Sequence, residues 1–74
     1  MRIKTTEEKV NEGLKELKAN GAIVETSGNS GGVAIQGVEA LYKFEEGILS
    51  ITITDKPWLV SEDFVEGKIR SYFN

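Results

Sequence analysis

The serine in the stretch SGNSGG, residues 27–32, is the first residue of this sequence whose neighbours suggest chemistry. Residues 28–32 fit the pattern G-x-S-x-G, which in many hydrolases places a nucleophilic serine on a sharp turn between a strand and a helix. A serine becomes a good nucleophile only when a base takes its proton, and that base is normally histidine. The chain has no histidine, and strand-like segments flank the motif on both sides. We therefore expect Ser30 to lie in a mobile, glycine-rich hairpin loop.

The other residues capable of chemistry are carboxylates and tyrosines. The chain has no cysteine, so thiolate metal sites and disulfides are excluded. The acidic residues are scattered, without the loop spacing that calcium sites require. We expect no catalytic residue, no metal site and no cofactor, with carboxylates or Tyr42 as the only remaining acid or base groups of an enzyme.

Nucleic-acid binding also has a possible motif in the same stretch. Gly28-x-x-Gly31 has the form of the loop that clamps backbone in KH domains, but that loop lies between helices in basic surroundings. A helix–sheet–helix order is also found in double-stranded-RNA-binding domains, whose second helix begins with lysines that contact phosphates. Here the corresponding residues 61–64 read SEDF, and the net charge is −3. We expect no nucleic-acid partner.

The length of 74 residues predicts a single domain, residues 1–74, with a small core. Domains of this size usually need a disulfide, a metal or a partner subunit, so the lack of cysteine and histidine favours a homodimer or a protein partner. The opening residues MRIKTTEEKV lack the apolar core of a signal peptide, and no apolar run reaches the ~20 residues that span a bilayer. These features predict a cytoplasmic protein without a membrane span.

Two helices are expected to position the core. Thr5-x-x-Glu8 has the form of a capping box, and Val10, Leu14 and Leu17 follow with helical spacing, which predicts a helix over residues 5–20. Gly13 lies along this apolar stripe, where close approach of another element would explain it. Ser61 is a good N-cap for a second helix over residues 61–73.

The residues between the helices have the pattern of an antiparallel sheet. The segments AIVET (22–26) and VAIQ (33–36) are strand-like, and the alternation changes phase near Gln36-Gly37. A bulge or a turn can produce this change; a turn is favoured and gives four strands instead of three. In the next hairpin, pairing Phe44 with Leu49 places Tyr42 beside Ile51 on one apolar face.

The expected fold is therefore α+β: an N-terminal helix, a three- or four-stranded antiparallel meander and a C-terminal helix, with both helices on one sheet face. Leu41 is the one apolar residue on the other face of the hairpin. Trp58 is either an exposed anchor for a partner or, as we favour, closes the apolar end of the core together with Leu59. The residues most suited to contact a partner or ligand are Trp58, Leu41, Tyr42 and Phe73.

The segment GVEALYKFEEGILSITITDKPWLVSEDFVEGKIRSYF, residues 37–73, resembles small uncharacterised bacterial proteins. It has a Gly-Val pair that opens a strand, a glycine hairpin, an I-x-I strand, a KP-aromatic step and a terminal amphipathic helix. It is loosely similar to the small proteins of the polyhydroxyalkanoate-granule system, which run helix, antiparallel strands, helix. The resemblance implies this fold, and it transfers no functional residue.

Two functions fit these features. The first is a non-catalytic domain that acts through self-association or through binding of a protein partner. The alternative is a module that binds an apolar small molecule, a lipid or a polyester in a space between sheet and helices, lined by Tyr42, Phe44, Ile51, Trp58 and Phe73.

Overall fold

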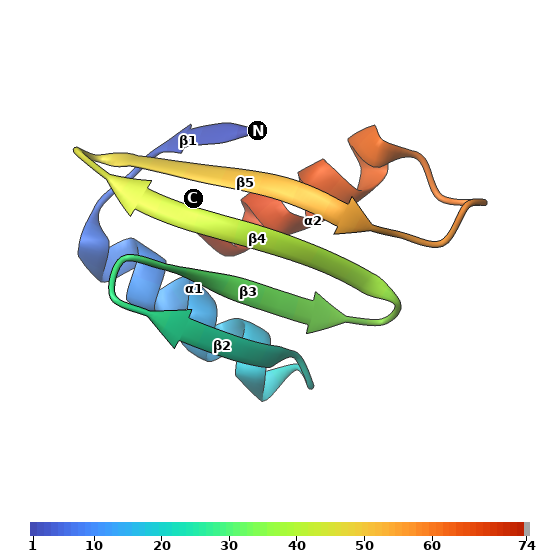
Figure 1. Ribbon diagram of the computed structural model, residues 1–74, viewed down its shortest axis with the longest axis horizontal. Helices are drawn as coiled ribbons and strands as arrows, with labels where there is room; N and C mark the ends of the chain where they lie inside the picture. The colour runs from blue at the N-terminus through green and yellow to red at the C-terminus, as the bar shows by residue number, and fades with distance from the viewer. Residues whose placement is uncertain (74) are drawn as a thin grey trace.

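The computed structural model describes residues 1–73, which form one antiparallel sheet with two helices on one of its faces (Figure 1). The sheet has five strands in the order β1-β5-β4-β3-β2. The α+β class and the placement of both helices on one face are confirmed. The elements, in chain order, are β1 (Arg2–Lys4), α1 (Glu7–Ala19), β2 (Ile23–Ser27), β3 (Ser30–Ile35), β4 (Val38–Glu45), β5 (Ile48–Asp55) and α2 (Glu62–Phe73).

The number of strands differs from the expected three or four, because β1 adds a fifth strand at the edge beside β5. It has only three residues, too few for an alternating pattern to be visible in the sequence. Its place is fixed by pairing of Ile3 with Leu49 and by two backbone hydrogen bonds. The Met1 amino group donates to the Ile51 carbonyl at 2.9 Å, and the Ile51 amide donates to the Met1 carbonyl at 2.8 Å.

The predicted hairpin register of β4 and β5 is confirmed, with Phe44 opposite Leu49 and Tyr42 opposite Ile51. The change of phase near Gln36-Gly37 is a turn, as expected. Both residues have positive φ, 50° and 81°, which is the backbone that a two-residue hairpin turn requires. The turn makes β3 and β4 separate strands and keeps Val33 and Ile35 on the face that carries the helices.

The stretch SGNSGG forms the hairpin connection between β2 and β3 that was expected, and its turn is only two residues long. Ser27 and Ser30 pair with each other, and only Gly28 and Asn29 lie between the strands. The turn is tied to β4, because the Asn29 side-chain amide donates to the Phe44 carbonyl at 2.8 Å and the Phe44 amide donates to the Asn29 carbonyl at 2.7 Å. Gly31 lies within β3, where a Cβ would come 2.9 Å from the ring of Tyr42.

Helix α1 begins two residues later than predicted. The N-cap is Thr6, whose hydroxyl oxygen accepts from the Lys9 amide at 3.2 Å, and the capping box of Thr5 and Glu8 does not form. Thr5 instead belongs to the link from β1, since its amide donates to the Gly47 carbonyl at 2.9 Å. The strand that the sequence pattern did not reveal therefore sets where the helix starts.

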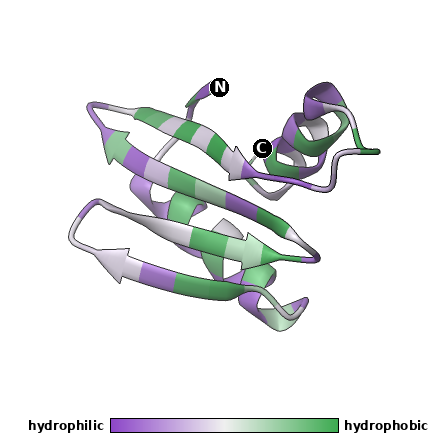
Figure 2. Ribbon diagram, turned by 45° about the vertical axis from the view of Figure 1, so that its right-hand side comes forward, coloured by the Kyte–Doolittle hydropathy of each residue, from purple (hydrophilic) through white to green (hydrophobic). Residues whose placement is uncertain are grey.

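The N-cap of α2 is as predicted: the Ser61 hydroxyl oxygen accepts from the Phe64 amide at 3.1 Å, and the helix runs from Glu62 to Phe73. Figure 2 shows hydrophobic and hydrophilic residues alternating along β4 and β5, whose inward side chains meet both helices. The buried core consists of Ile3, Val10, Leu14, Leu17, Ala40, Tyr42, Leu49, Ile51, Val65 and Phe73.

The two helices meet where Phe73 lies against the backbone of α1 at Gly13. A Cβ at Gly13 would come 2.5 Å from the Phe73 ring and 2.7 Å from the Tyr72 carbonyl oxygen. The expected close approach at Gly13 is therefore confirmed. Gly67, the other glycine within a helix, has nothing within 4 Å of the position of a Cβ.

Alanine at these two glycines should have opposite effects on stability. Gly67→Ala should raise the free energy of unfolding by about 1 kcal/mol, because it gains helix propensity without a clash. For a domain of this size that corresponds to a rise in Tm of about 4–8 °C. Gly13→Ala should lower the Tm, because overpacking against backbone costs about 1–3 kcal/mol. Thermal unfolding followed by circular dichroism measures both, and a stabilised Gly13→Ala would contradict the packing described here.

Candidate functional site

The connection between β5 and α2 carries the most exposed large apolar side chains of the molecule. Trp58 is 85% exposed and Leu59 is 79% exposed. The prediction that these two residues close the apolar end of the core is therefore wrong. Figure 2 shows the connection extending beyond the sheet, with hydrophobic residues at its tip.

Three hydrogen bonds within residues 55–60 constrain the backbone of this connection. The Val60 amide donates to the Pro57 carbonyl at 3.0 Å, which closes the turn that carries Trp58 and Leu59. The Lys56 ammonium donates to the Val60 carbonyl at 2.8 Å across the same turn. The Lys56 amide donates in turn to the Asp55 carboxylate at 3.0 Å. The exposed indole thus stands on a closed turn with internal hydrogen bonds.

A third apolar side chain, Phe64, lies on the first turn of α2 and is 58% exposed. Lys68, one helical turn further, has its ammonium 5.7 Å from the centre of the Phe64 ring, within cation–π range. Sequence reasoning missed Phe64. The available signal was its position on the helix: Phe64 directly precedes the buried Val65, but it lies about half a turn around the helix from the buried Phe73. We refer to Trp58, Leu59 and Phe64 together as the Trp58 surface.

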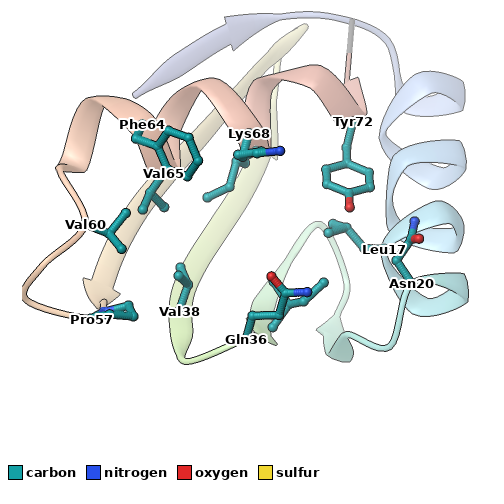
Figure 3. A pocket seen from close by; sticks show the side chains of 12 residues that line it. Leu17, Asn20, Gln36, Val38, Pro57, Val60, Phe64, Val65, Lys68 and Tyr72 are labelled. Carbon is teal, nitrogen blue, oxygen red and sulfur yellow. The ribbon is translucent and has the colours of Figure 1, made fainter.

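A cleft of about 330 Å³ lies next to this surface, between α2, the β3–β4 turn and the end of α1 (Figure 3). Phe64, Val65 and Lys68 reach it from α2, and Val38 and Gln36 face them from the turn. The remaining lining residues are Leu17, Asn20, Ile35, Pro57, Val60, Ile69 and Tyr72. The walls are mainly apolar, with amide, ammonium and phenol groups among the lining side chains.

The space between the sheet and the helices is much smaller. A cavity of about 30 Å³ remains there, lined in part by Tyr42, Ile51 and Phe73. This is room for about one water molecule, far below the ~300 Å³ of an ordinary ligand pocket. The five residues expected to surround a ligand do not surround one space, since Trp58 lies outside on the exposed turn.

Of the four residues expected to contact a partner or ligand, the structure places two on the surface and two in the core. Trp58 is exposed on the connection between β5 and α2. Leu41 is 57% exposed and lies on the sheet face that no helix covers. Tyr42 and Phe73 are buried. Burial also raises the pKa of the Tyr42 phenol, so this group is neutral at physiological pH.

Ser30 and the carboxylates are the other side chains whose chemistry the sequence suggested. The Ser30 hydroxyl donates to the Ser27 carbonyl at 3.2 Å, within its own turn. In this part of the chain, no group of three or more carboxylates lies close enough together to hold a metal ion. None of the helices described here is long and apolar enough to cross a membrane.

Comparison with known proteins gives no relative for this chain: no family model, no curated protein and no solved structure matches it. The function is therefore inferred from the surfaces described above.

The exposure of Trp58 predicts a simple spectroscopic result. It is the only tryptophan of the chain, so its fluorescence should have the emission of an indole in water and should be quenched readily by iodide. Trp58→Ala should change the free energy of unfolding by no more than about 0.5 kcal/mol, as at other exposed positions. A blue-shifted emission of the purified wild type without any partner, or a large loss of stability in Trp58→Ala, would show that the indole is buried.

Proposed function

We propose that this chain is a non-catalytic domain of the cytoplasm that acts through association, and that the Trp58 surface is its contact with a partner protein. The observation that carries the proposal is the exposure of Trp58 and Leu59 at the tip of a closed turn. Tryptophan is strongly enriched among the residues that dominate binding energy at protein interfaces.

The Trp58 surface combines apolar area in water with a backbone that is already ordered in the unbound chain. An exposed indole and an exposed leucine keep apolar area in water, and burial of apolar area contributes about 25 cal/mol per Å². The hydrogen bonds of Lys56 and Val60 constrain the turn in the unbound chain, so less conformational entropy is lost on binding. Both properties favour a surface that is buried only in a complex.

The charges beside the surface indicate the chemistry of the partner. Glu62 and Asp63 occupy the first turn of α2, directly after the apolar turn, and both are exposed. A matching partner therefore offers an apolar pocket for the indole, with lysine or arginine opposite Glu62 and Asp63 and an acidic group opposite Lys68, whose ammonium lies on the Phe64 ring. Such complementarity contributes to partner choice and to the association rate.

The test begins with capture of a partner by the immobilised chain. The wild type and Thr52→Ala, a control on the open sheet face, should retain the same protein, and Trp58→Ala should lose it. With the purified partner, Trp58 emission should shift to shorter wavelength, and Trp58→Ala should weaken the Kd about 30-fold or more, the factor for ~2 kcal/mol. Equal binding by Trp58→Ala and wild type would refute the proposal.

The cleft of about 330 Å³ supports a second function, binding of an apolar small molecule. Its volume reaches the lower end of ordinary ligand pockets, and its walls include Val38 and Ile69. The resemblance of residues 37–73 to proteins of the polyhydroxyalkanoate-granule system suggests a fatty acid or a hydroxyalkanoate oligomer as the ligand. If the chain has this function, the ligand binds in the cleft and not in the small interior cavity beside Tyr42.

NMR titration with these two ligand types separates the second function from the first. Binding should shift the resonances of Val38 and Ile69 and leave those of Thr52 on the open sheet face unchanged. Val60→Asp, which places a charge at the cleft, should abolish the shifts in a chain that circular dichroism shows to be folded. Titrations without shifts at the cleft residues would exclude this function and leave the Trp58 proposal intact.

A further inference from the structure

The two edges of the sheet differ in how well they are protected against pairing with another strand. At one edge, β1 is three residues long and carries Arg2 and Lys4, and short length and positive charge both discourage further pairing. At the other edge, β2 has five residues, no proline, no lysine and no bulge in its pairing with β3. Its side chains are mostly exposed, and Ile23 is 68% exposed. The outer side of β2 is a row of backbone groups without a strand beside it (Figure 1).

Helix α1 lies along the same edge, and the charged side chains that it presents toward β2 are arranged by sign. A groove of about 340 Å³ runs between α1 and β2, lined by Glu8 and Glu12 in the first half of the helix and by Lys15 and Lys18 in the second half. All four side chains are exposed. The only ion pair among residues 1–73 joins Lys43 and Glu45, so these four charges form none with other residues in that range.

We propose that the β2 edge together with this face of α1 pairs with the same edge of a second copy, around a two-fold axis. Two β2 strands then pair antiparallel and continue the sheet from one copy into the other. The two α1 helices run antiparallel beside each other, so that Glu8 and Glu12 of each copy face Lys15 and Lys18 of the other. A second copy turned about a two-fold axis presents the matching arrangement of charge, which is what an interface between identical chains provides.

The register of this pairing follows from the positions of the charges. A residue opposite itself lies on the axis, and Glu25 in that position would set two carboxylates directly against each other. With Val24 on the axis, Ile23 of one copy lies opposite Glu25 of the other, and the two Val24 side chains meet on the helix-covered side of the sheet. Val24 and Leu14 both line the groove.

The geometry of α1 agrees with Val24 on the axis. Val24 lies three residues beyond Gly21, or about 10 Å along a strand. The same distance back along a helix covers about seven residues, which reaches the level of Leu14, between Glu12 and Lys15. The axis therefore passes between the acidic and the basic halves of α1. The size of the chain adds a reason for pairing, since a 74-residue domain without disulfides gains stability from a second subunit.

Charge reversal tests this arrangement without touching the core. Sedimentation should show that the wild type dimerises at micromolar concentration. Glu8→Lys with Glu12→Lys, and separately Lys15→Glu with Lys18→Glu, should each weaken dimerisation about tenfold or more, because each places like charges across the axis. An equimolar mixture of the two variants should form a heterodimer, since one then presents four positive and the other four negative side chains. Circular dichroism verifies that each variant is folded.

A cysteine at position 24 tests the register. In this otherwise cysteine-free chain, a short thiol-to-thiol crosslinker should join two Val24→Cys chains, because directly opposite residues have Cβ atoms about 4.5–5.5 Å apart. Ser50→Cys, on the open face of the inner strand β5, should remain monomeric on a denaturing gel after the same treatment. A monomeric wild type, or variants that fail to form the heterodimer, would overturn the proposal. A dimer whose stability depends on Trp58 and not on the α1 charges would also overturn it and would assign dimerisation to the Trp58 surface.

Discussion

The contact of Phe73 with the backbone of α1 at Gly13 is the constraint on which the rest of this small fold depends. It joins the last residue of α2 that the structure describes to the middle of α1, so the two helices form one layer over one face of the sheet. The Thr5 hydroxyl donates to the Phe73 carbonyl at 3.4 Å and links the same point to the start of the chain. Both helices lie on one face, and the open face keeps Leu41 and Ile23 in contact with solvent.

The position of α2 explains why the Trp58 surface is exposed. Val65 and Phe73 must lie in the core, so the helix crosses the sheet and its first turn lies toward the end of β5. The chain from Asp55 to Ser61 therefore has to pass around that end, where no other element covers it. Pro57 ends the strand, because proline has no amide to donate to the neighbouring strand. Trp58 is consequently exposed by the topology of the fold, and the hydrogen bond of Lys56 to the Val60 carbonyl stabilises the turn.

The parts of the fold that could be predicted from the sequence are those in which one physical pattern repeats over many residues. The register of β4 and β5 could be predicted because a shift by one residue would turn Tyr42 and Ile51 toward solvent. β1 could not, because three residues contain no repeat, and its location depends on contacts with residues nearly fifty positions away. The N-cap at Thr6 followed from that missed strand, since Thr5 is engaged with Gly47.

The candidate site was less predictable than the fold for a related reason. Apolar character favours burial, and for Trp58 and Leu59 that preference was the only sequence signal. Their exposure depends on how far the end of β5 lies from the start of α2, a distance that the local sequence does not encode. The cleft has the same origin, because Val38 and Ile69 are brought together only when the sheet and α2 are in place.

The two surfaces proposed for association belong to different parts of the sheet. β2 is the outermost strand on one side, and two strands, β3 and β4, separate it from β5, which leads to Trp58. Pairing at β2 therefore leaves the Trp58 surface free in both copies. A dimer would present two Trp58 turns, and a partner with two pockets would bind the second turn at a high effective concentration. The protected edge at β1 is important here. Both β2 edges are used within the dimer, and Arg2 and Lys4 discourage pairing of the two β1 edges that stay free, which would extend the dimer into an open chain of subunits.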